Sequence, residues 1–257
     1  MIPKIIHYCW FGGKPLPQET LNYIESWKKY CPDYEIKEWN ETNFDIDRYQ
    51  YAREAYNAGK YAFVSDVARL VALDEEGGVY LDTDVELLKS FDSFLHHKAF
   101  IGFESPTHLT SGIIGAEKGN KFISDNLATY ETRRFILADG KTDTTANVVG
   151  LTDYMLDRGL RLDNSLQDFP GLITVYPREY FCPKKSEIFG YKNLPEKAHA
   201  IHYFNGSWQL HATPEYKRLR RKYKWIPYFI RKKLILAILG ENKKGFFPTL
   251  VRIFPIR

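Results

Sequence analysis

Alternating apolar and polar segments mark the first elements of the chain. The apolar run 2–11 predicts a first, central strand that ends at Gly12 and Gly13. The segment 17–30 predicts an amphipathic helix, whose apolar residues at helical spacing are Leu21, Ile24 and Trp27. Alternation over 34–39 predicts a second strand. This strand–helix–strand opening favours an α/β nucleotide-binding fold.

The pattern continues through the middle of the chain. Residues 64–73 follow a helical period, and two glycines separate them from a short apolar strand at 79–81. Other apolar runs predict further elements: strand or packed loop at 91–95 and 99–103, helices at 120–130 and 150–158, and a strand at 172–176. The polar segment 142–147 could line a pocket or cap the second of these helices.

Two carboxylates, Asp82 and Asp84, follow the short strand. Residues i and i+2 of a strand point to the same side, so the two side chains can converge if the chain opens into a loop there. Repulsion between them is relieved by a cation that prefers oxygen ligands, such as Mg²⁺ or Mn²⁺, and such an ion can hold a diphosphate. The spacing alone also fits a solvated turn. Upstream, Asp66 and Arg69 share one face of the predicted helix.

These motifs resemble a known family. The chain is similar to the sugar-binding region of glycosyltransferase family 32, and to the glucosyltransferase domain of large clostridial toxins, in Ser65-Asp66, Arg69 and Gly77-Gly78-Val79-Tyr80-Leu81-Asp82-Thr83-Asp84. The resemblance covers roughly residues 2–208. It implies a single-domain GT-A-type nucleotide-sugar transferase fold, which is a Rossmann-like mixed sheet flanked by helices. It also implies a loop at 109–116 on the sugar or acceptor side.

The resemblance assigns roles to residues near the aspartates. Asp84 is the expected metal ligand, and Asp82 is expected to contact metal, ribose or both. Asp66 and Arg69 would hold sugar hydroxyls, and Arg69 could also meet phosphate charge. The residues assigned to donor binding on this side are Cys9, Trp10, Ser65 and Tyr80.

Two residues of the opening strand have a structural alternative. The segment 6–13 resembles the family's opening motif, in which the tryptophan faces the nucleobase, and Trp10 stands at the strand end where open α/β sheets bind ligands. Trp10 could instead pack against a helix. His7 is expected to be a hydrogen-bonded core residue rather than a ligand.

A second cluster lies at 199–208. A histidine near paired carboxylates would favour manganese over calcium, although a histidine before aromatic residues is by itself more often structural. In family 32 the corresponding segment folds over the diphosphate. The resemblance therefore makes His202 a metal or phosphate contact and Ser207 and Trp208 phosphate contacts, with His199 the less favoured histidine.

Charge divides the chain. Residues 217–257 contain 13 Lys and Arg against the single acid Glu241, a net charge of +12, whereas the remaining 216 residues have 23 bases and 31 acids, a net charge of −8. We therefore expect a catalytic domain at 1–213 and a basic, aromatic segment at 214–257. In that segment bases alternate with Trp225, Tyr228, Phe229 and the aliphatic run 234–239. This composition is typical of an interfacial anchor on anionic lipid.

Alternatives for the tail are a basic helix packed on the core, or nucleic-acid binding, which nothing else in the chain supports. No signal peptide or spanning segment is expected, and three widely spaced cysteines, Cys9, Cys31 and Cys182, indicate a reduced cytoplasmic protein. The expected location is the inner face of the cell membrane, with peripheral attachment.

The predicted function is a metal-dependent retaining glycosyltransferase with Mn²⁺ or Mg²⁺ as its cofactor. It would move a hexose from a nucleotide sugar, with a UDP-sugar favoured, to a lipid-linked or surface polysaccharide acceptor. The alternatives are a non-catalytic nucleotide-sugar-binding protein and a nucleotide-sugar hydrolase of the same fold.

Overall fold

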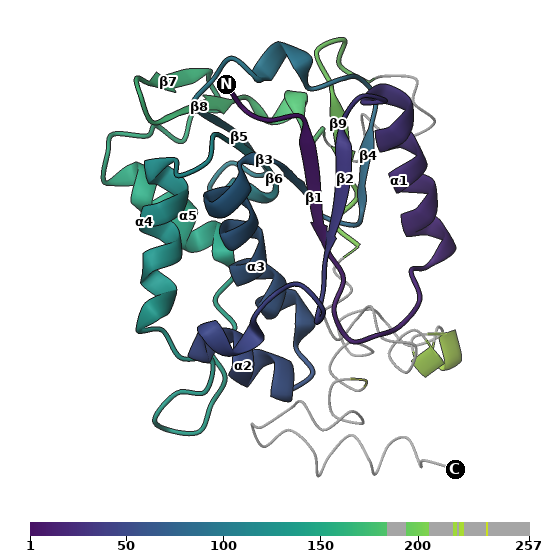
Figure 1. Ribbon diagram of the computed structural model, residues 1–257, viewed down its shortest axis with the longest axis vertical. Coiled ribbons are helices and arrows are strands. Elements are labelled where there is room, and N and C mark those ends of the chain that lie inside the picture. The colour runs from purple at the N-terminus through teal and green to yellow at the C-terminus, as the bar shows by residue number, and fades with distance from the viewer. Residues whose placement is uncertain (184–193, 206–217, 220, 224–234, 236–257) are drawn as a thin grey trace. The chain divides into compact units, whose positions relative to one another are not determined.

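A seven-stranded mixed sheet forms the centre of the protein's larger unit, Met1–Phe204, in the computed structural model (Figure 1). The structure describes residues 1–183, 194–205, 218, 219, 221–223 and 235. The strands follow the order β2-β1-β3-β6-β5-β8-β7, and β4 and β9 form a separate pair. The strand bounds are β1 Ile5–Cys9, β2 Glu35–Trp39, β3 Gly78–Leu81, β4 Val85–Leu87, β5 Ala99–Phe103, β6 Leu109–Ala116, β7 Gln167–Phe169, β8 Ile173–Tyr176 and β9 Ala200–His202.

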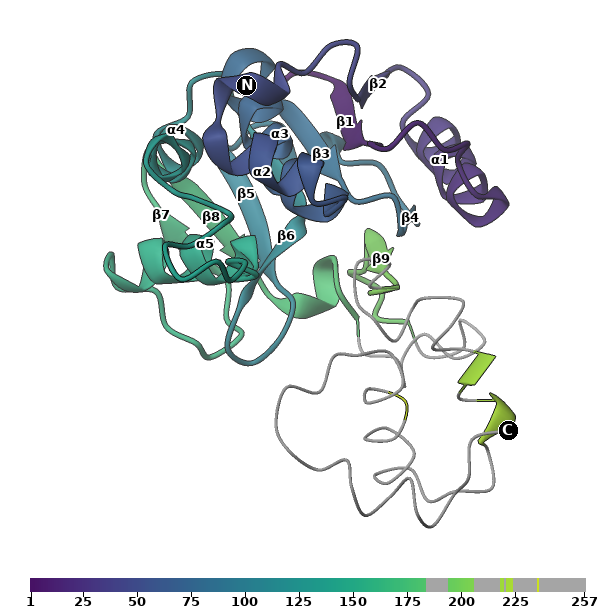
Figure 2. The same ribbon diagram turned by 90° about the horizontal axis from the view of Figure 1, so that it is seen from below.

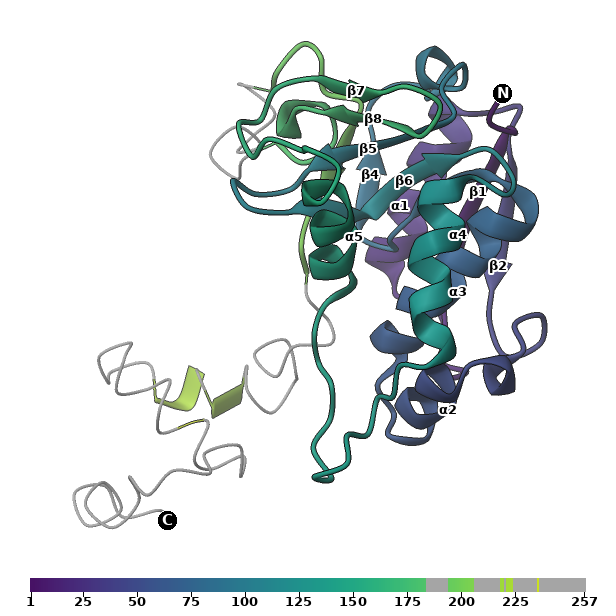
Figure 3. The same cartoon turned by 90° about the vertical axis from the view of Figure 1, so that its left-hand side faces the viewer.

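Helices cover both faces of the sheet. The helix bounds are α1 Gln18–Tyr30, α2 Gln50–Asn57, α3 Tyr61–Glu76, α4 Lys121–Ala128 and α5 Asn147–Leu156. Helices α2 to α5 lie on one side of the sheet, and α1 lies on the other side with β4 and β9 (Figures 1 and 3). The predicted α/β architecture, a mixed sheet flanked by helices, is confirmed.

Alternation along the strands divides the core into two layers. Because successive strand residues point to opposite faces, Val79 and Leu81 of β3 pack on the α1 side, and Tyr80 packs on the α3 side. His7 of β1 is fully buried and hydrogen-bonded at both ring nitrogens, to the Gly77 carbonyl and to the Trp39 indole N–H. The prediction of a core histidine is confirmed.

Helix α1 buries a different stripe from the one predicted. Its buried residues are Thr20, Tyr23, Ile24 and Trp27. Leu21 is 39% exposed, so its assignment to the packed face was wrong. At about 100° per residue, Leu21 lies at the edge of the stripe that Ile24 and Trp27 define. Trp27 is fixed further by its indole N–H, which donates to the Val85 carbonyl at 2.8 Å.

Helix α3 follows the predicted apolar period closely. Residues 63, 64 and 66–73 are all buried, because this helix lies between the sheet and helices α2 and α4. It ends at Gly77, whose φ of 69° is accessible at low cost to glycine. The chain then turns directly into β3, which begins one residue later, so the pattern of this helix and strand sets where the aspartates stand.

Strand β1 lies at a topological switch point of the sheet. It pairs in parallel with β2, the next strand in the sequence, on one side and with β3 on the other. In open α/β sheets, ligands bind outside the carboxyl ends of strands at such a switch point. Cys9 and Trp10 stand at that end of β1, and Asp82 stands at that end of β3.

Several of the remaining sequence predictions differ from the structure. The expected loop at 109–116 is strand β6, buried throughout and antiparallel to both β3 and β5, so the loop assignment was wrong. Small residues flanking an apolar pair suit a central strand that packs on two sides. Residues 92–94 form a 3-10 turn and 99–103 form β5, and helix α5 begins three residues before the predicted start.

The tail predictions fall mainly outside the described residues. The boundary at 213 and 214, and nearly all of 214–257, lie there, whereas the second compact unit is Asn205–Arg257. Within the described parts of the chain, no helix is long and apolar enough to cross a bilayer. The three cysteines are free and buried.

Candidate functional site

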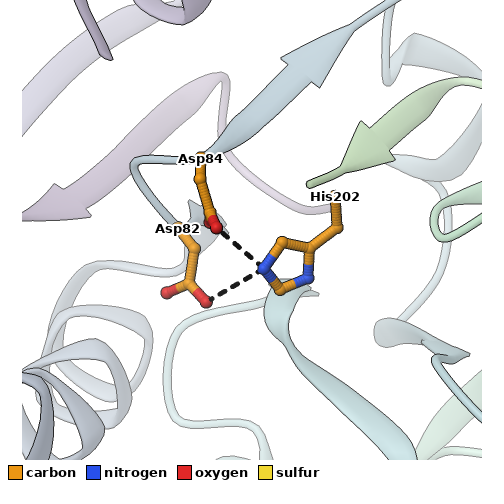
Figure 4. Close-up of side chains that lie close together, drawn as sticks. All are labelled: Asp82, Asp84 and His202. Atoms are coloured by element: carbon orange, nitrogen blue, oxygen red, sulfur yellow. Dashed lines mark ion pairs between the residues drawn. The ribbon is translucent and has the colours of Figure 1, made fainter. Parts of the chain in front are cut away.

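Two aspartates and a histidine meet beyond the end of β3. Asp82 follows β3, Asp84 precedes β4, and the pairing of Val85 with His202 in the β4–β9 ladder brings the histidine beside them (Figures 2 and 4). His202 Nε2 lies 3.1 Å from Asp84 Oδ1 and 3.7 Å from Asp82 Oδ2. One ligand atom from each residue falls within 4.8 Å of the others. Among the described residues, this is the group of acidic and imidazole side chains that could hold a metal ion.

The donor set fits a divalent cation. Two carboxylate oxygens and one imidazole nitrogen suit Mn²⁺ and related ions better than Ca²⁺, which takes oxygen ligands. The site is also shaped closely by Gly112 of β6. A Cβ atom at Gly112 would lie 2.6 Å from His202 Cε1 and 2.7 Å from Asp82 Oδ2. Only a glycine lets the strand pass this close to both ligands.

The charges of the group call for a cation. Burial alone would lower the pKa of His202, but the hydrogen bond and negative charge of Asp84 raise it well above the usual value for histidine. Nε2 therefore lies between two carboxylates whose negative charge favours a positive charge at this point. A metal ion at that point would supply the same positive charge, so the arrangement is compatible with metal binding.

Arg69 links helix α3 to the aspartates. Its Nη2 lies 3.1 Å from Asp66 Oδ1 and 3.3 Å from Asp82 Oδ1, and its Nη1 donates to the Ser111 carbonyl at 2.8 Å. The guanidinium also lies 4.7 Å from the centre of the Tyr80 ring. Arg69 is only 5% exposed, so its charge must be balanced locally, and it fixes Asp66 and Asp82 relative to each other.

Asp66 is the second buried carboxylate of the site. Burial raises its pKa to about 6, and the charge of Asp82 adds to this, although Arg69 opposes the shift. Its backbone carbonyl accepts a hydrogen bond from Asn147 Nδ2 at 2.9 Å, at the first turn of α5. Asn147 Oδ1 is buried and has no hydrogen-bond partner among the residues that the structure describes. An amide oxygen left in this state is available to a polar ligand.

The residues assigned to donor binding occupy different depths. Tyr80 is buried, and its hydroxyl donates to Asp82 Oδ1 at 2.9 Å, so it supports Asp82 from behind. Cys9 is buried on the same side. Ser65 is half-buried and donates to the Tyr61 carbonyl at 3.1 Å. Trp10 is half-buried at the end of β1, and its indole N–H donates to the Lys14 carbonyl at 2.5 Å.

The second histidine of the 199–208 cluster lies apart from the metal group. His199 Nδ1 is hydrogen-bonded to the Ser90 carbonyl at 2.9 Å, and its ring packs edge-on against Phe94. Ser207 and Trp208 lie outside the described residues, so their predicted phosphate contacts stay predictions.

The sequence interpretation missed three residues at the site. Gly112 lay within a stretch taken for a loop, and Asn147 lay within a link taken for a pocket lining or a cap. Glu104 directly follows the apolar run of β5, as Asp82 follows the apolar run of β3. A carboxylate directly after an apolar strand was therefore a sequence signal for Glu104 as well as for Asp82.

Comparison with known proteins points to sugar transfer. Residues 17–101 match the family model described as a glycosyltransferase sugar-binding region containing a DXD motif. An inositol phosphoceramide mannosyltransferase of Schizosaccharomyces pombe is 31% identical over 126 residues, which is 48% of this chain and 35% of that protein. An uncharacterised glycosyltransferase of Acanthamoeba polyphaga mimivirus is 29% identical, over 57% of this chain and 67% of that protein. The chain thus spans about a third of the length of the mannosyltransferase.

Solved structures with some likeness are also glycosyltransferases. The PaToxG glycosyltransferase aligns with a TM-score of 0.48 and 21% identity over 62% of this chain and 70% of its own. The UDP-bound glycosyltransferase domain of the YGT toxin aligns with a TM-score of 0.45 and 13% identity over 92% and 89%. The matched range of the family model includes Asp66, Arg69, Asp82 and Asp84. Residues 17–101 of this chain are therefore similar to glycosyltransferase sugar-binding regions that contain a DXD motif.

Proposed function

We propose that the chain is a metal-dependent glycosyltransferase that moves a hexose from a nucleotide sugar, with a UDP-sugar favoured, to a glycan or lipid-linked glycan. The observation that carries the proposal is the convergence of Asp82, Asp84 and His202 beside the buried Asp66–Arg69 pair. The metal group could hold the diphosphate of a nucleotide-sugar donor, and the Asp66–Arg69 pair could hold its sugar. Binding of a nucleotide alone would not require the sugar-binding pair.

The proposed cofactor is Mn²⁺, with Mg²⁺ as the alternative. When bound, the ion would offset the charge of the diphosphate and of the leaving group. Asp82 and Asp84 would each supply a carboxylate oxygen, and His202 would supply Nε2. The imidazole nitrogen favours Mn²⁺, because Mg²⁺ strongly prefers oxygen ligands.

Protein groups would orient the sugar. Asp66 can accept hydrogen bonds from sugar hydroxyls, and Arg69 can donate to a sugar or phosphate oxygen while holding Asp82 in place. Cys9, Ser65 and Tyr80 would support this side of the donor pocket. Trp10 at the switch point would stack on the base.

The proposed transfer retains the anomeric configuration, as the resemblance to family 32 implies. The acceptor hydroxyl then attacks on the face from which the diphosphate leaves. No base is required on the opposite face of the sugar. The hydroxyl proton must go either to a diphosphate oxygen or to a side chain at that same face.

Two observations support the proposal of a lipid-linked or surface polysaccharide acceptor. The name of the fission-yeast relative joins mannosyl transfer to inositol phosphoceramide. The +12 segment 217–257, with its aromatic residues, has the composition of an anchor on anionic lipid. We accordingly propose a cytoplasmic protein attached peripherally to the inner face of the cell membrane.

The activity can be tested with a panel of nucleotide sugars and Mn²⁺, scoring thermal shift, slow donor hydrolysis and transfer products. Asp84→Asn is the matched variant, because it removes a ligand charge but keeps the side-chain shape. We expect donor hydrolysis by the wild-type protein and its loss in Asp84→Asn, with an unchanged circular dichroism spectrum. Equal hydrolysis by both proteins would contradict the assignment of Asp84 as a metal ligand. Nucleotide binding without any turnover would favour the non-catalytic alternative, and free sugar as the sole product with every acceptor would favour the hydrolase.

A further inference from the structure

A third carboxylate stands at the same edge of the sheet as the metal group. Glu104 follows the last residue of β5, and its backbone N–H donates to the His108 carbonyl at 3.0 Å, where the chain turns towards β6. The register between β5 and β6 shifts between Ile101 and Phe103. Such an irregularity re-aims the side chains that follow it. Strand β6 lies between β5 and β3, so Glu104 and Asp82 stand at the same ends of strands two positions apart.

Strand β6 lies between Glu104 and the metal group. Thr110 Oγ1 accepts the N–H of Gly112 at 3.1 Å, and the nearby Thr110 hydroxyl lowers the pKa of the Glu104 carboxyl group. The carbonyl of Gly112 accepts the N–H of Asp82 at 2.9 Å. Glu104 therefore adjoins the same short piece of β6 that packs against Asp82 and His202.

Glu104 differs from the other carboxylates of the site in its partners. Asp66 and Asp82 are engaged by Arg69, and Asp84 faces His202. No ion pair to Glu104 is found among the residues that the structure describes, and Glu104 is not one of the three metal-ligand candidates.

Its environment also suits proton transfer. Burial raises the pKa of Glu104 to about 7, a shift that Asp82 increases and that His202 and Arg69 oppose through their charges. A carboxyl group with a pKa near neutrality can take up a proton and release it again at the working pH. The side chain is half-buried, so part of it can be reached by a substrate.

We propose that Glu104 is a catalytic residue that accepts the proton of the attacking hydroxyl. The proposal rests on the glycosyltransferase function proposed above. As the acceptor oxygen forms a bond to the anomeric carbon, the bond from that carbon to the diphosphate oxygen breaks and its electron pair leaves with the diphosphate. The hydroxyl proton passes to a Glu104 carboxylate oxygen, which later returns it to solvent or to the departing nucleotide.

Two other roles compete with this one. If a diphosphate oxygen took the proton, Glu104 would be dispensable for turnover. If Glu104 only supported β6 through Thr110, its loss would disturb Gly112 and with it the ligands Asp82 and His202, and nucleotide binding would suffer. The three roles therefore differ in which quantity changes, the rate of the chemical step or the affinity for the nucleotide.

The test is Glu104→Gln in the full chain, which keeps the shape of the side chain but removes the proton-accepting charge. The substrate is the UDP-sugar that the wild-type protein hydrolyses fastest with saturating Mn²⁺, and water serves as the acceptor. We expect kcat to fall by about 10²–10⁴-fold, with the KM for the donor and the calorimetric affinity for UDP with Mn²⁺ within about twofold of wild type. The wild-type kcat should rise with pH as Glu104 ionises, since the base must be ionised, and this rise should be absent in Glu104→Gln. Glu75→Gln, the same change at an exposed residue of α3 paired with Arg48, should match wild type throughout.

Each outcome decides between the roles. A Glu104→Gln protein that hydrolyses the donor at the wild-type rate overturns the proposal and leaves the proton to the diphosphate. A fall in UDP affinity equal to the fall in rate also overturns it, in favour of a supporting role. A wild-type protein that binds no UDP with Mn²⁺ refutes the proposed function itself, and the role of Glu104 with it.

Discussion

At the scale of single residues, the candidate metal group depends on the absence of one side chain. Gly112 packs against Asp82 and His202 so closely that a methyl group there would overlap both. We expect Gly112→Ala to weaken the binding of UDP with Mn²⁺ by more than about tenfold, because the ligands must move apart. Calorimetry with and without Mn²⁺ measures this effect.

The matched control for Gly112→Ala is Gly150→Ala in α5, where an added Cβ meets no atom within 4 Å. Alanine is favoured over glycine inside a helix, so this variant should be slightly more stable, by about 0.5–1 kcal/mol. Its UDP affinity should be unchanged. Wild-type affinity in Gly112→Ala would show that the ligands do not need the observed approach of β6.

At the scale of elements, Glu54 of α2 anchors the segment that leads from the 3-10 turn at residues 129–131 towards α5. Its carboxylate accepts hydrogen bonds from Arg134 Nε at 2.8 Å and from the backbone N–H groups of Phe135 and Ile136, both at 2.9 Å. Glu54→Gln should lower the free energy of unfolding by about 1.5–3 kcal/mol, because it weakens hydrogen bonds to a charged acceptor. Urea unfolding at pH 7 measures the loss.

This contribution should depend on pH. The hydrogen bond from Arg134, with those from the backbone, lowers the pKa of Glu54 to about 2. A group whose pKa is lower in the folded state stabilises the protein above its unfolded pKa of about 4.3, and that stability disappears as the pH falls towards 2. The difference in urea midpoint between wild type and Glu54→Gln should therefore shrink between pH 5 and pH 3. A difference that stays constant over this range would contradict the pKa shift.

The elements also show which parts of the site the sequence could predict. Helix α3, Gly77 and β3 follow from local periodicity and turn chemistry, so the placement of Asp66, Arg69 and Asp82 around one point could be expected from adjacent residues alone. The contact of His202 with Asp84 needs the pairing of β4 with β9, two three-residue strands that carry no distinctive pattern. From the residues alone, a structural histidine was the more probable interpretation, and only the family resemblance indicated otherwise.

Long-range packing explains the other errors. Gly112 and Gly115 of β6 are small because the strand passes close to the ligands and to Phe100 of β5, and a single sequence does not distinguish such a strand from a loop. Leu21 satisfies the helical period of α1 but lies beyond the width of the surface that the sheet offers. Periodicity predicts that a stripe exists, whereas the neighbouring elements decide how wide it is.

At the scale of the whole molecule, the chain is divided by charge, with −8 on residues 1–216 and +12 on residues 217–257. We propose that the second part holds the protein on anionic lipid. Each base near such a surface contributes about 1 kcal/mol, so a few of the 13 are enough for attachment. Vesicles containing phosphatidylserine should therefore sediment the full chain. Binding should fall steeply between about 50 and 500 mM salt, because salt screens the attraction between the bases and the anionic lipid.

Two variants separate attachment from catalysis. A chain that ends at Thr213 should stay folded, still hydrolyse the donor slowly and no longer sediment with the vesicles. In the full chain, replacement of Lys217, Arg218, Arg220, Arg221 and Lys222 by glutamine should weaken sedimentation strongly. The control changes five exposed lysines of the first unit to glutamine: Lys28, Lys29, Lys60, Lys118 and Lys121. Since these lysines lie outside the basic segment, sedimentation should change little. Equal sedimentation of the shortened and full chains would refute the anchor, and loss of folding on shortening would mean that the basic segment packs on the core.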